Sequence, residues 1–327
     1  MEIDHSLARN VILVTGTPRS GTTVVGTQLG LARHSAALYE PMNADSGDRT
    51  ISRYFECPGA NGYDYDTFDD LVRRIAALTL RLKPGVFEHE NGVRRWLKYV
   101  IGGQSRQSLR KARFSGKVEN VIWKDPLAAL SARAAVARFG LPLVITYRPP
   151  LAVAASFKRL NWRFNAHQML ETLGGAYFED DPLPDRDNLS IPECAAAIWT
   201  MIYGELYKAL QDHPGHVFPV TMDDLLVDPR GTYAQLYEEL GLEATEASEA
   251  GIREAEEKIQ DKEKSDLPSG HPHTKDRNIS AANSYWSSVL DQDEIEVVLR
   301  RAGMLPQQFE QHFDQRRASR KASAEAV

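Results

Sequence analysis

The sequence is poor in cysteine and carries no excess of positive charge. Its 327 residues include only two cysteines, Cys57 and Cys194, and neither lies in a CxxC or Cys/His pattern. We therefore expect neither a disulfide framework nor a structural zinc site. The formal net charge of −6 argues against a nucleic-acid partner, because nonspecific binding to phosphates depends on excess Lys and Arg. Any site for an anionic ligand has to be built locally.

Long apolar runs are also missing. No segment approaches the roughly 20 consecutive apolar residues that cross a bilayer. The N-terminus carries Glu2 and Asp4 and leads directly into a short apolar run, which is not the pattern of a signal peptide. These features predict a cytoplasmic protein without a membrane span and leave its oligomeric state open.

Short continuous apolar runs recur along the chain, and each is followed by a segment of helical character. The first, NVILV at 10–14, ends in a glycine-containing turn before an expected helix at 21–33. Similar runs precede Lys124, Arg148 and Met222. Such runs are typical of strands that are buried on both faces. The alternation predicts an α/β fold with a P-loop-type central parallel sheet flanked by helices.

The chain is expected to form a single domain over residues 1–315. Helical insertions at about 50–115 and 160–212 separate the expected strands and would form the acceptor side of the site. Acidic, proline-broken segments at 179–188 and 261–276 predict surface loops. The charged, aperiodic segment 316–327 predicts a flexible tail.

A phosphate-binding loop follows the first expected strand. GTPRSGTT at 16–23 has the spacing of a P-loop and stands between a strand and a helix. Its glycines let backbone N–H groups and the helix N-terminus converge on an anion. Thr22 replaces the lysine that bridges the β- and γ-phosphates of a nucleoside triphosphate. A donor with one phosphate beside the transferred group needs only N–H groups, the hydroxyls of Thr22 and Thr23, and a cation such as Arg19.

This loop resembles that of sulfotransferases that use 3′-phosphoadenosine 5′-phosphosulfate (PAPS). Their phosphosulfate loop reads P-R/K-S-G-T-T, which residues 18–23 match. Arginine at position 19 is similar to bacterial and carbohydrate-modifying members, whereas the soluble small-molecule sulfotransferases have lysine. The resemblance implies that PAPS contacts the loop residues Thr17, Pro18, Arg19, Ser20, Gly21, Thr22 and Thr23.

A second motif begins at Arg148, directly after an expected strand. Ser156 lies eight positions later on a helix that Pro150 can start, so both side chains can reach one phosphate. RPPLAVAAS resembles the R-x-P-x-x-x-x-x-S pattern that binds the 3′-phosphate of PAPS in the family. The family's C-terminal GxxGxxK/R loop is missing. Lys275 and Arg277 occupy that region, either closing over the adenosine or lying in a solvated loop.

Sulfuryl transfer requires a base for the acceptor hydroxyl and positive charge around the transferred group. Glu40 ends an expected strand at the carboxyl edge of the sheet, where open α/β folds bind ligands. The resemblance to carbohydrate and tyrosine sulfotransferases implies that Glu40 is the general base. It also implies that Lys124, with Arg19, stabilises charge during transfer. Asp125 is the alternative base, although Asp before Pro is equally a helix N-cap pattern.

These motifs predict a metal-independent sulfotransferase that releases adenosine 3′,5′-bisphosphate (PAP). The expected acceptor is a hydroxyl of a carbohydrate, a glycolipid or a small metabolite. Two alternatives are a P-loop kinase or nucleotide hydrolase, with Asp125 on magnesium, and a noncatalytic adenine-nucleotide-binding protein. Arg159 and Arg163, near the end of the helix after Arg148, are interpreted either as contacts to an acidic acceptor or as solvated helix-end charges.

Overall fold

The computed structural model describes residues 6–84, 103–260 and 285–325. Its strands are β1 (Asn10–Thr15), β2 (Ser35–Tyr39), β3 (Asn120–Lys124), β4 (Leu143–Tyr147) and β5 (Val217–Thr221). The helices up to β4 are α1 (Thr22–Leu29), α2 (Tyr65–Ala77), α4 (Gln104–Phe114), the 3-10 turn η1 (Pro126–Ser131) and α5 (Ala132–Phe139). After β4 come α6 (Pro150–Leu160), α7 (Ala166–Thr172), α8 (Ile191–Asp212), α9 (Met222–Val227), α10 (Pro229–Glu239), α11 (Glu246–Gln260), η2 (Tyr285–Ser288), α13 (Gln292–Ala302) and α14 (Leu305–Glu325).

The five strands form one parallel sheet in the order β2-β3-β1-β4-β5, which confirms the predicted fold class. In register, Lys124 at the end of β3 pairs with Val14 of β1 and with Tyr39 of β2. The segments that follow β1, β2 and β3 therefore leave from one edge of the sheet. Because β1 has β3 on one side and β4 on the other, this edge is also where the strand order reverses, the usual ligand site of such sheets.

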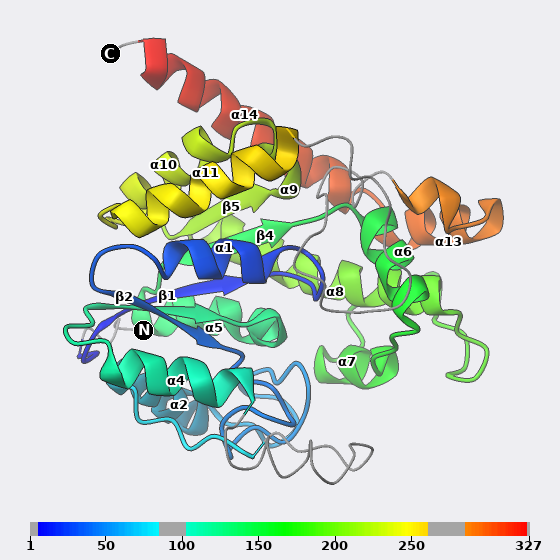
Figure 1. The fold of residues 1–327 in the computed structure, drawn as a ribbon. Helices are drawn as coiled ribbons and strands as arrows, with labels where there is room; N and C mark the ends of the chain where they lie inside the picture. Colours follow the sequence, from blue (N-terminus) through cyan, green and yellow to red (C-terminus); the bar gives the residue numbers. More distant parts are fainter. Residues whose placement is uncertain (1–5, 85–102, 261–284, 326–327) are drawn as a thin grey trace, which may run out of the picture.

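Side chains of each strand alternate between two apolar layers, as the period of a strand requires. Ile12, Val14 and Ile122 face a layer that includes residues of α1, α9, α10 and α11. Val11 and Leu13 face the larger layer with α2, α5 and α8. Figure 1 shows α10 and α11 on one side of the sheet and α2, α4 and α5 on the other. Burial on both faces explains why these strands read as continuous apolar runs.

The predicted insertions contain helices, with bounds that differ from the sequence pattern. Within 50–115 lie α2 and α4, and within 160–212 lie α7 and α8. The expected helix at 21–33 is shorter, because α1 ends at Leu29 and the Gly30 N–H bonds back to Gly26 O. Residues 179–188 contain no helix or strand, as predicted for a surface loop. The loop predicted at 261–276 lies outside the described residues.

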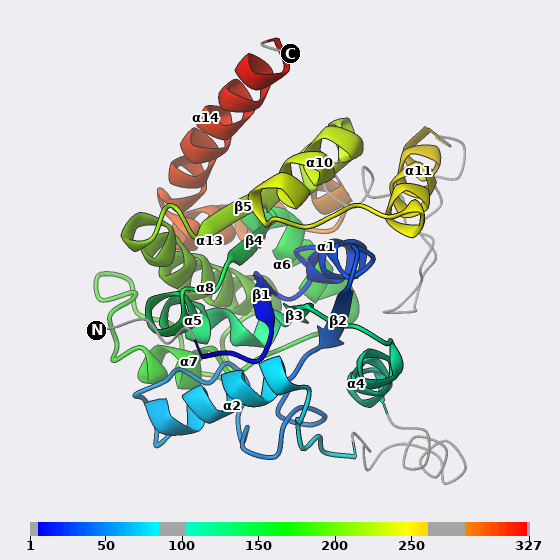
Figure 2. The same cartoon turned by 90° about the vertical axis from the view of Figure 1, so that its left-hand side faces the viewer.

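The C-terminal helix α14 extends into the segment 316–327, for which a flexible tail was predicted. Phe309 and Phe313, one helical turn apart, are buried against α8 and β4. Further along, Arg316 forms an ion pair with Glu239 and Arg317 with Asp224. Figure 2 shows α14 running from α13 beyond the body of the molecule toward the C-terminus. These ion pairs hold the first part of the predicted tail as helix.

Candidate active site

The phosphate loop joins β1 to α1 through two positions that have room only for glycine. A Cβ at Gly16 would overlap the Thr146 carbonyl of the neighbouring strand. A Cβ at Gly21 would overlap the sulfur of Met222, and Gly21 has φ 99°, which side chains disfavour. The loop is therefore packed tightly against the ends of β4 and β5.

The N-terminus of α1 carries no cap from the described side chains. Gly21 is the N-cap residue, and the first turn contains no acidic residue. By contrast, Asp64 caps α2 and Ser190 caps α8 through side-chain oxygens. The first N–H groups of a helix lack intrahelical partners and carry partial positive charge. The arrangement suits an external anion, with Thr22 buried and Thr23 exposed at the first two helical positions.

The loop hydroxyls differ in how they are used. Thr17 Oγ1 is buried and makes no hydrogen bond of ordinary geometry within the described part of the chain. Ser20 Oγ lies 2.7 Å from Thr146 Oγ1, and the Ser20 N–H donates to Thr17 O. The Ser20 side chain therefore fixes the loop to β4. The Thr17 hydroxyl, beside that of Tyr203, therefore keeps hydrogen-bonding capacity for a ligand.

Arg19 connects the loop to α6. Its Nε donates to Ser156 Oγ over 3.2 Å, and its guanidinium lies 5.8 Å from the ring centroid of Trp162. The backbone of Arg19 is left-handed, with φ 77°. Non-glycine residues in this region are uncommon and cluster at functional sites. The loop therefore holds the Arg19 side chain in place at a cost in backbone conformational free energy.

Arg148 reaches the same loop from the end of β4. Its Nη1 donates to Arg19 O over 2.9 Å, and the residue is only 6% exposed. Helix α8 fixes the backbone here, because Trp199 Nε1 donates to Arg148 O and the Arg148 N–H donates to the Tyr203 hydroxyl. Helix α6 begins at Pro150, as predicted, and buries Ser156. The two sequence motifs thus form one contiguous cluster.

Glu40 and Lys124 form an ion pair at the same edge of the sheet. Lys124 Nζ lies 2.8 Å from Glu40 Oε1, and Asn43 Nδ2 donates to Glu40 Oε2 over 2.9 Å. Glu40, directly after β2, has a left-handed backbone with φ 51°. Its side chain is 30% exposed, whereas that of Lys124 is 3% exposed. The carboxylate is held by two neighbours and still reaches solvent.

Lys124 passes beneath α1 at Gly26. A Cβ at Gly26 would lie 2.7 Å from both Cβ and Cγ of Lys124, closer than carbon atoms can approach. Glycine inside a helix costs about 1 kcal/mol relative to alanine. The close approach of α1 to β3 offsets that cost. The stem of Lys124 passes through this contact and ends at Glu40.

Asp125 is fully buried, and both of its carboxylate oxygens are engaged by the protein. Oδ1 accepts from the Leu127 N–H, as an N-cap with Pro126 at the first position of η1. Oδ2 accepts from the Met42 N–H over 2.6 Å and from Trp123 Nε1. Burial, followed by the charge of Glu40, raises the pKa of Asp125 to about 7. Asp125 thus links β3 to the segment after Glu40.

Some predicted residues are not brought to this cluster, and others join it unpredicted. Lys275 and Arg277 lie outside the described residues. Arg163 Nη1 donates to Leu189 O, so it is used within the chain. The residues that sequence reasoning missed are Gly26, Asn43 and Thr146 as neighbours of the site. A glycine inside an expected helix was the available signal for Gly26.

A group of aromatic side chains lies partly beside this cluster. Phe164 contacts Tyr54 at a centroid distance of 5.7 Å, and Phe157 links Phe164 to Trp162. Tyr54 is 39% exposed, and its hydroxyl donates to Asp45. Two others, Tyr63 and Phe68, are buried in the core. Tyr54 therefore offers the exposed aromatic face of this group.

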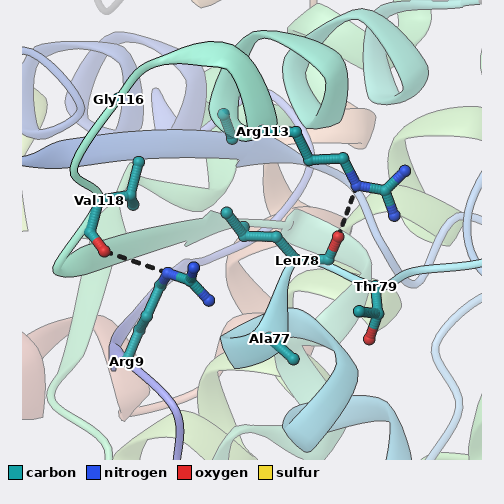
Figure 3. Close-up of a pocket in the computed structure, with 8 residues that line it drawn as sticks. Arg9, Ala77, Leu78, Thr79, Arg113, Gly116 and Val118 are labelled. Carbon is teal, nitrogen blue, oxygen red and sulfur yellow. Dashed lines mark hydrogen bonds between the residues drawn. The ribbon is translucent and has the colours of Figure 1, made fainter.

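A cavity of about 260 Å³ lies at the opposite edge of the sheet, beside the start of β1 and the approach to β3. Figure 3 shows Arg9 and Arg113 among its lining residues. Arg9 donates to the carbonyls of Val118 and Ala76, and Arg113 donates to that of Leu78. Both arginines thus satisfy backbone carbonyls around the end of α2, which is a structural role.

No helix among residues 6–84, 103–260 and 285–325 has the length and apolar character needed to cross a membrane. The same residues contain no group of three His, Cys, Asp or Glu side chains arranged to hold a metal ion.

No protein-family model matches the chain, and no curated protein matches it in sequence. Solved structures do resemble it. The sulfotransferase domain of the Synechococcus PCC 7002 olefin synthase is 14% identical, with TM-score 0.42, over 91% of this chain and 97% of that one. The sulfotransferase domain of the curacin biosynthetic pathway is 13% identical, with TM-score 0.45, over 89% and 97%. Sulfotransferase STF1 of Mycobacterium tuberculosis H37Rv is 17% identical, with TM-score 0.39, over 76% and 72%.

By their names, these three structures are a sulfotransferase and two sulfotransferase domains.

Proposed function

We propose that this chain is a sulfotransferase that moves the sulfuryl group of PAPS onto an acceptor hydroxyl. The observation that carries the proposal is the contact of Arg19 with both Ser156 and Arg148. This contact joins a P-loop that lacks the triphosphate-binding lysine to a second cation, the buried Arg148. PAPS carries two separate anionic groups, the 5′-phosphosulfate and the 3′-phosphate, and each has a matching subsite in this cluster.

The phosphosulfate fits the uncapped end of α1. Backbone N–H groups, the buried hydroxyl of Thr17 and the guanidinium of Arg19 would be donors to it there. The buried Arg148 and Ser156 would hold the 3′-phosphate, which adenosine 5′-phosphate lacks. A guanidinium can bind phosphate in a bidentate manner. We therefore expect Arg148 to contribute most to the preference for a 3′-phosphorylated donor.

In the proposed reaction, the acceptor oxygen attacks sulfur in line with the bond to the 5′-phosphate oxygen. The S–O bond to the acceptor forms as the bond between sulfur and the 5′-phosphate oxygen breaks. The electron pair of the broken bond leaves with PAP. Glu40 takes the proton of the acceptor hydroxyl. Lys124 places positive charge beside the carboxylate and the sulfuryl oxygens. No metal ion is required for this balance.

Glu40 is favoured over Asp125 as the base because of what surrounds each carboxylate. Asp125 is fully buried, and its two oxygens accept from three N–H groups of the protein. Glu40 is part exposed and oriented by Lys124 and Asn43. An acceptor can reach Glu40 without disturbing the fold.

We propose a small-molecule or carbohydrate hydroxyl as the acceptor. The exposed face of Tyr54, whose hydroxyl is engaged by Asp45, offers such a molecule an apolar contact on the same segment as Glu40.

Nucleotide binding tests the donor assignment. Calorimetry should show that the wild-type chain binds PAP more tightly than adenosine 5′-phosphate, and that Arg148→Ala removes at least about tenfold of this preference. Strict dependence on magnesium and ATP, with no preference for the 3′-phosphate, would instead support a P-loop kinase or hydrolase.

A further inference from the structure

Arg159, which the sequence predicts to be either a solvated helix-end charge or an acceptor contact, is half-buried in the structure. It lies one turn after Ser156 on α6, and its Nε is buried without a hydrogen-bond partner among the described residues. Its guanidinium lies 5.7 Å from the ring centroid of Tyr285. The Tyr285 hydroxyl is also buried and lacks a described partner.

The neighbouring cations on α6 and just after it do have protein partners. Lys158 Nζ donates to Glu294 and to Val289 O, and Arg163 donates to Leu189 O. No carboxylate of the described chain forms an ion pair with Arg159. A buried donor that loses water without gaining a partner costs free energy, and a charged one costs more. An anionic ligand is the partner that would offset this cost.

The position of Arg159 indicates which anion this is. Residues three apart on a helix are surface neighbours, with Cβ atoms about 5–6 Å apart. Ser156 and Arg159 therefore share one face, and Ser156 Oγ already contacts Arg19. At the C-terminal end of α6 the chain turns back, and Trp162 packs against the same Arg19 guanidinium. This face of α6 is turned toward the proposed donor site.

Charge arithmetic supports a second arginine there. A phosphate monoester carries about −1.5 to −2 at neutral pH. If Arg19 serves the phosphosulfate, Arg148 alone leaves part of the 3′-phosphate charge unbalanced in a site that is largely closed to water.

We propose that Arg159, supported by the ring of Tyr285, is a second guanidinium for the 3′-phosphate of the donor and acts across Ser156 from Arg148. The inference rests on the proposed function, because it assumes a 3′-phosphorylated donor. It makes Arg159 and the Tyr285 hydroxyl determinants of donor specificity. Their unpaired polar atoms become satisfied when the nucleotide binds.

The test is calorimetric binding of PAP and of adenosine 5′-phosphate to the full chain. Arg159→Met keeps the length of the side chain and removes its charge. It should weaken PAP binding by about tenfold and leave adenosine 5′-phosphate binding within about twofold. Arg159→Lys should recover part of the loss, and Tyr285→Phe should weaken PAP by about threefold. Lys158→Met is the matched control and should leave the preference for PAP unchanged.

Two outcomes would overturn the inference. The first is a PAP preference in Arg159→Met equal to that of the wild type. The second is an equal loss for both nucleotides, which would assign Arg159 to packing or to another part of the ligand. Thermal unfolding of each variant separates a folding defect from a binding effect. If the wild-type chain itself shows no preference for PAP, the proposed function fails instead.

Discussion

Lys124 Nζ and Glu40 Oε1 lie 2.8 Å apart, joining the end of β3 to the residue after β2. The strands are paired so that Tyr39 faces Lys124, which places Glu40 next to the lysine at the carboxyl edge. The pair is asymmetric, because the lysine is buried and the carboxylate is part exposed. We therefore interpret Lys124 as a fixed charge and Glu40 as the group that meets the acceptor.

Glu40→Gln should keep the contacts to Lys124 and Asn43 while removing the base. We expect turnover to fall by about 10²–10⁴-fold, the usual contribution of a general base, with PAP affinity nearly unchanged. Single-turnover transfer from PAPS and calorimetry measure the two quantities. Asp125→Asn is the comparison, since turnover retained in Glu40→Gln and lost in Asp125→Asn would transfer the role to Asp125.

Lys124→Met should lower turnover by about 10²–10³-fold, because charge that stabilises the transition state is lost while the stem volume is kept. The unfolding free energy should change far less than turnover, since Glu40 is part exposed and can be hydrated. Turnover within about twofold of the wild type would show that Lys124 does not stabilise the transition state.

Gly26→Ala should destabilise the chain although alanine favours helix. The new methyl group meets Lys124 Cβ and Cγ at 2.7 Å. Overpacking of this kind costs about 1–3 kcal/mol, which exceeds the roughly 1 kcal/mol gain in helix propensity. Chemical denaturation measures the difference, and turnover should fall with the displacement of Lys124.

Gly215→Ala is the control for Gly26→Ala, since a Cβ at Gly215 meets nothing within 4 Å. It should change the unfolding free energy by less than about 0.5 kcal/mol. A Gly26→Ala chain that is more stable than the wild type would contradict the close approach of α1 to β3.

Asp125 should make the stability of the chain depend on pH near neutrality. Its pKa is about 7 in the fold, against 3.8 for an unperturbed aspartate side chain, so folding favours the protonated form. The contribution to stability is fully present below about pH 4 and is lost as pH rises through about 7. The unfolding temperature of the wild type should therefore fall, relative to Asp125→Asn, from about pH 4 to about pH 7 and then level off. Parallel curves for the two chains would refute this coupling.

The strands and the phosphate loop were predictable because their signals are local. Apolar runs such as NVILV are typical of strands that are covered on both faces. The glycine spacing of the phosphate loop lies within one short stretch, 16–23. The Asp125-Pro126 pair likewise predicted an N-cap, and the structure has one. Its bond to the Met42 N–H was not predictable, because it depends on the pairing of β2 with β3.

The contacts that assemble the site are long-range. Arg19 and Ser156 are 137 positions apart in sequence, and only the order β1-β4 in the sheet brings their elements together. The contact of Arg159 with Tyr285 depends on η2, which follows it by more than a hundred residues. The helix at Arg316 and Arg317 is held by Glu239 and Asp224, which the aperiodic tail sequence gives no means to anticipate.

The most direct test of the proposed function is transfer of radioactive sulfate from labelled PAPS in the presence of a metal chelator. The purified chain is incubated with a cell extract, and labelled organic products and released PAP are quantified. We predict a labelled product formed together with PAP by the wild type and lost in Glu40→Gln. No labelled product from PAPS, with nucleotide turnover seen only with ATP and magnesium, would contradict the assignment.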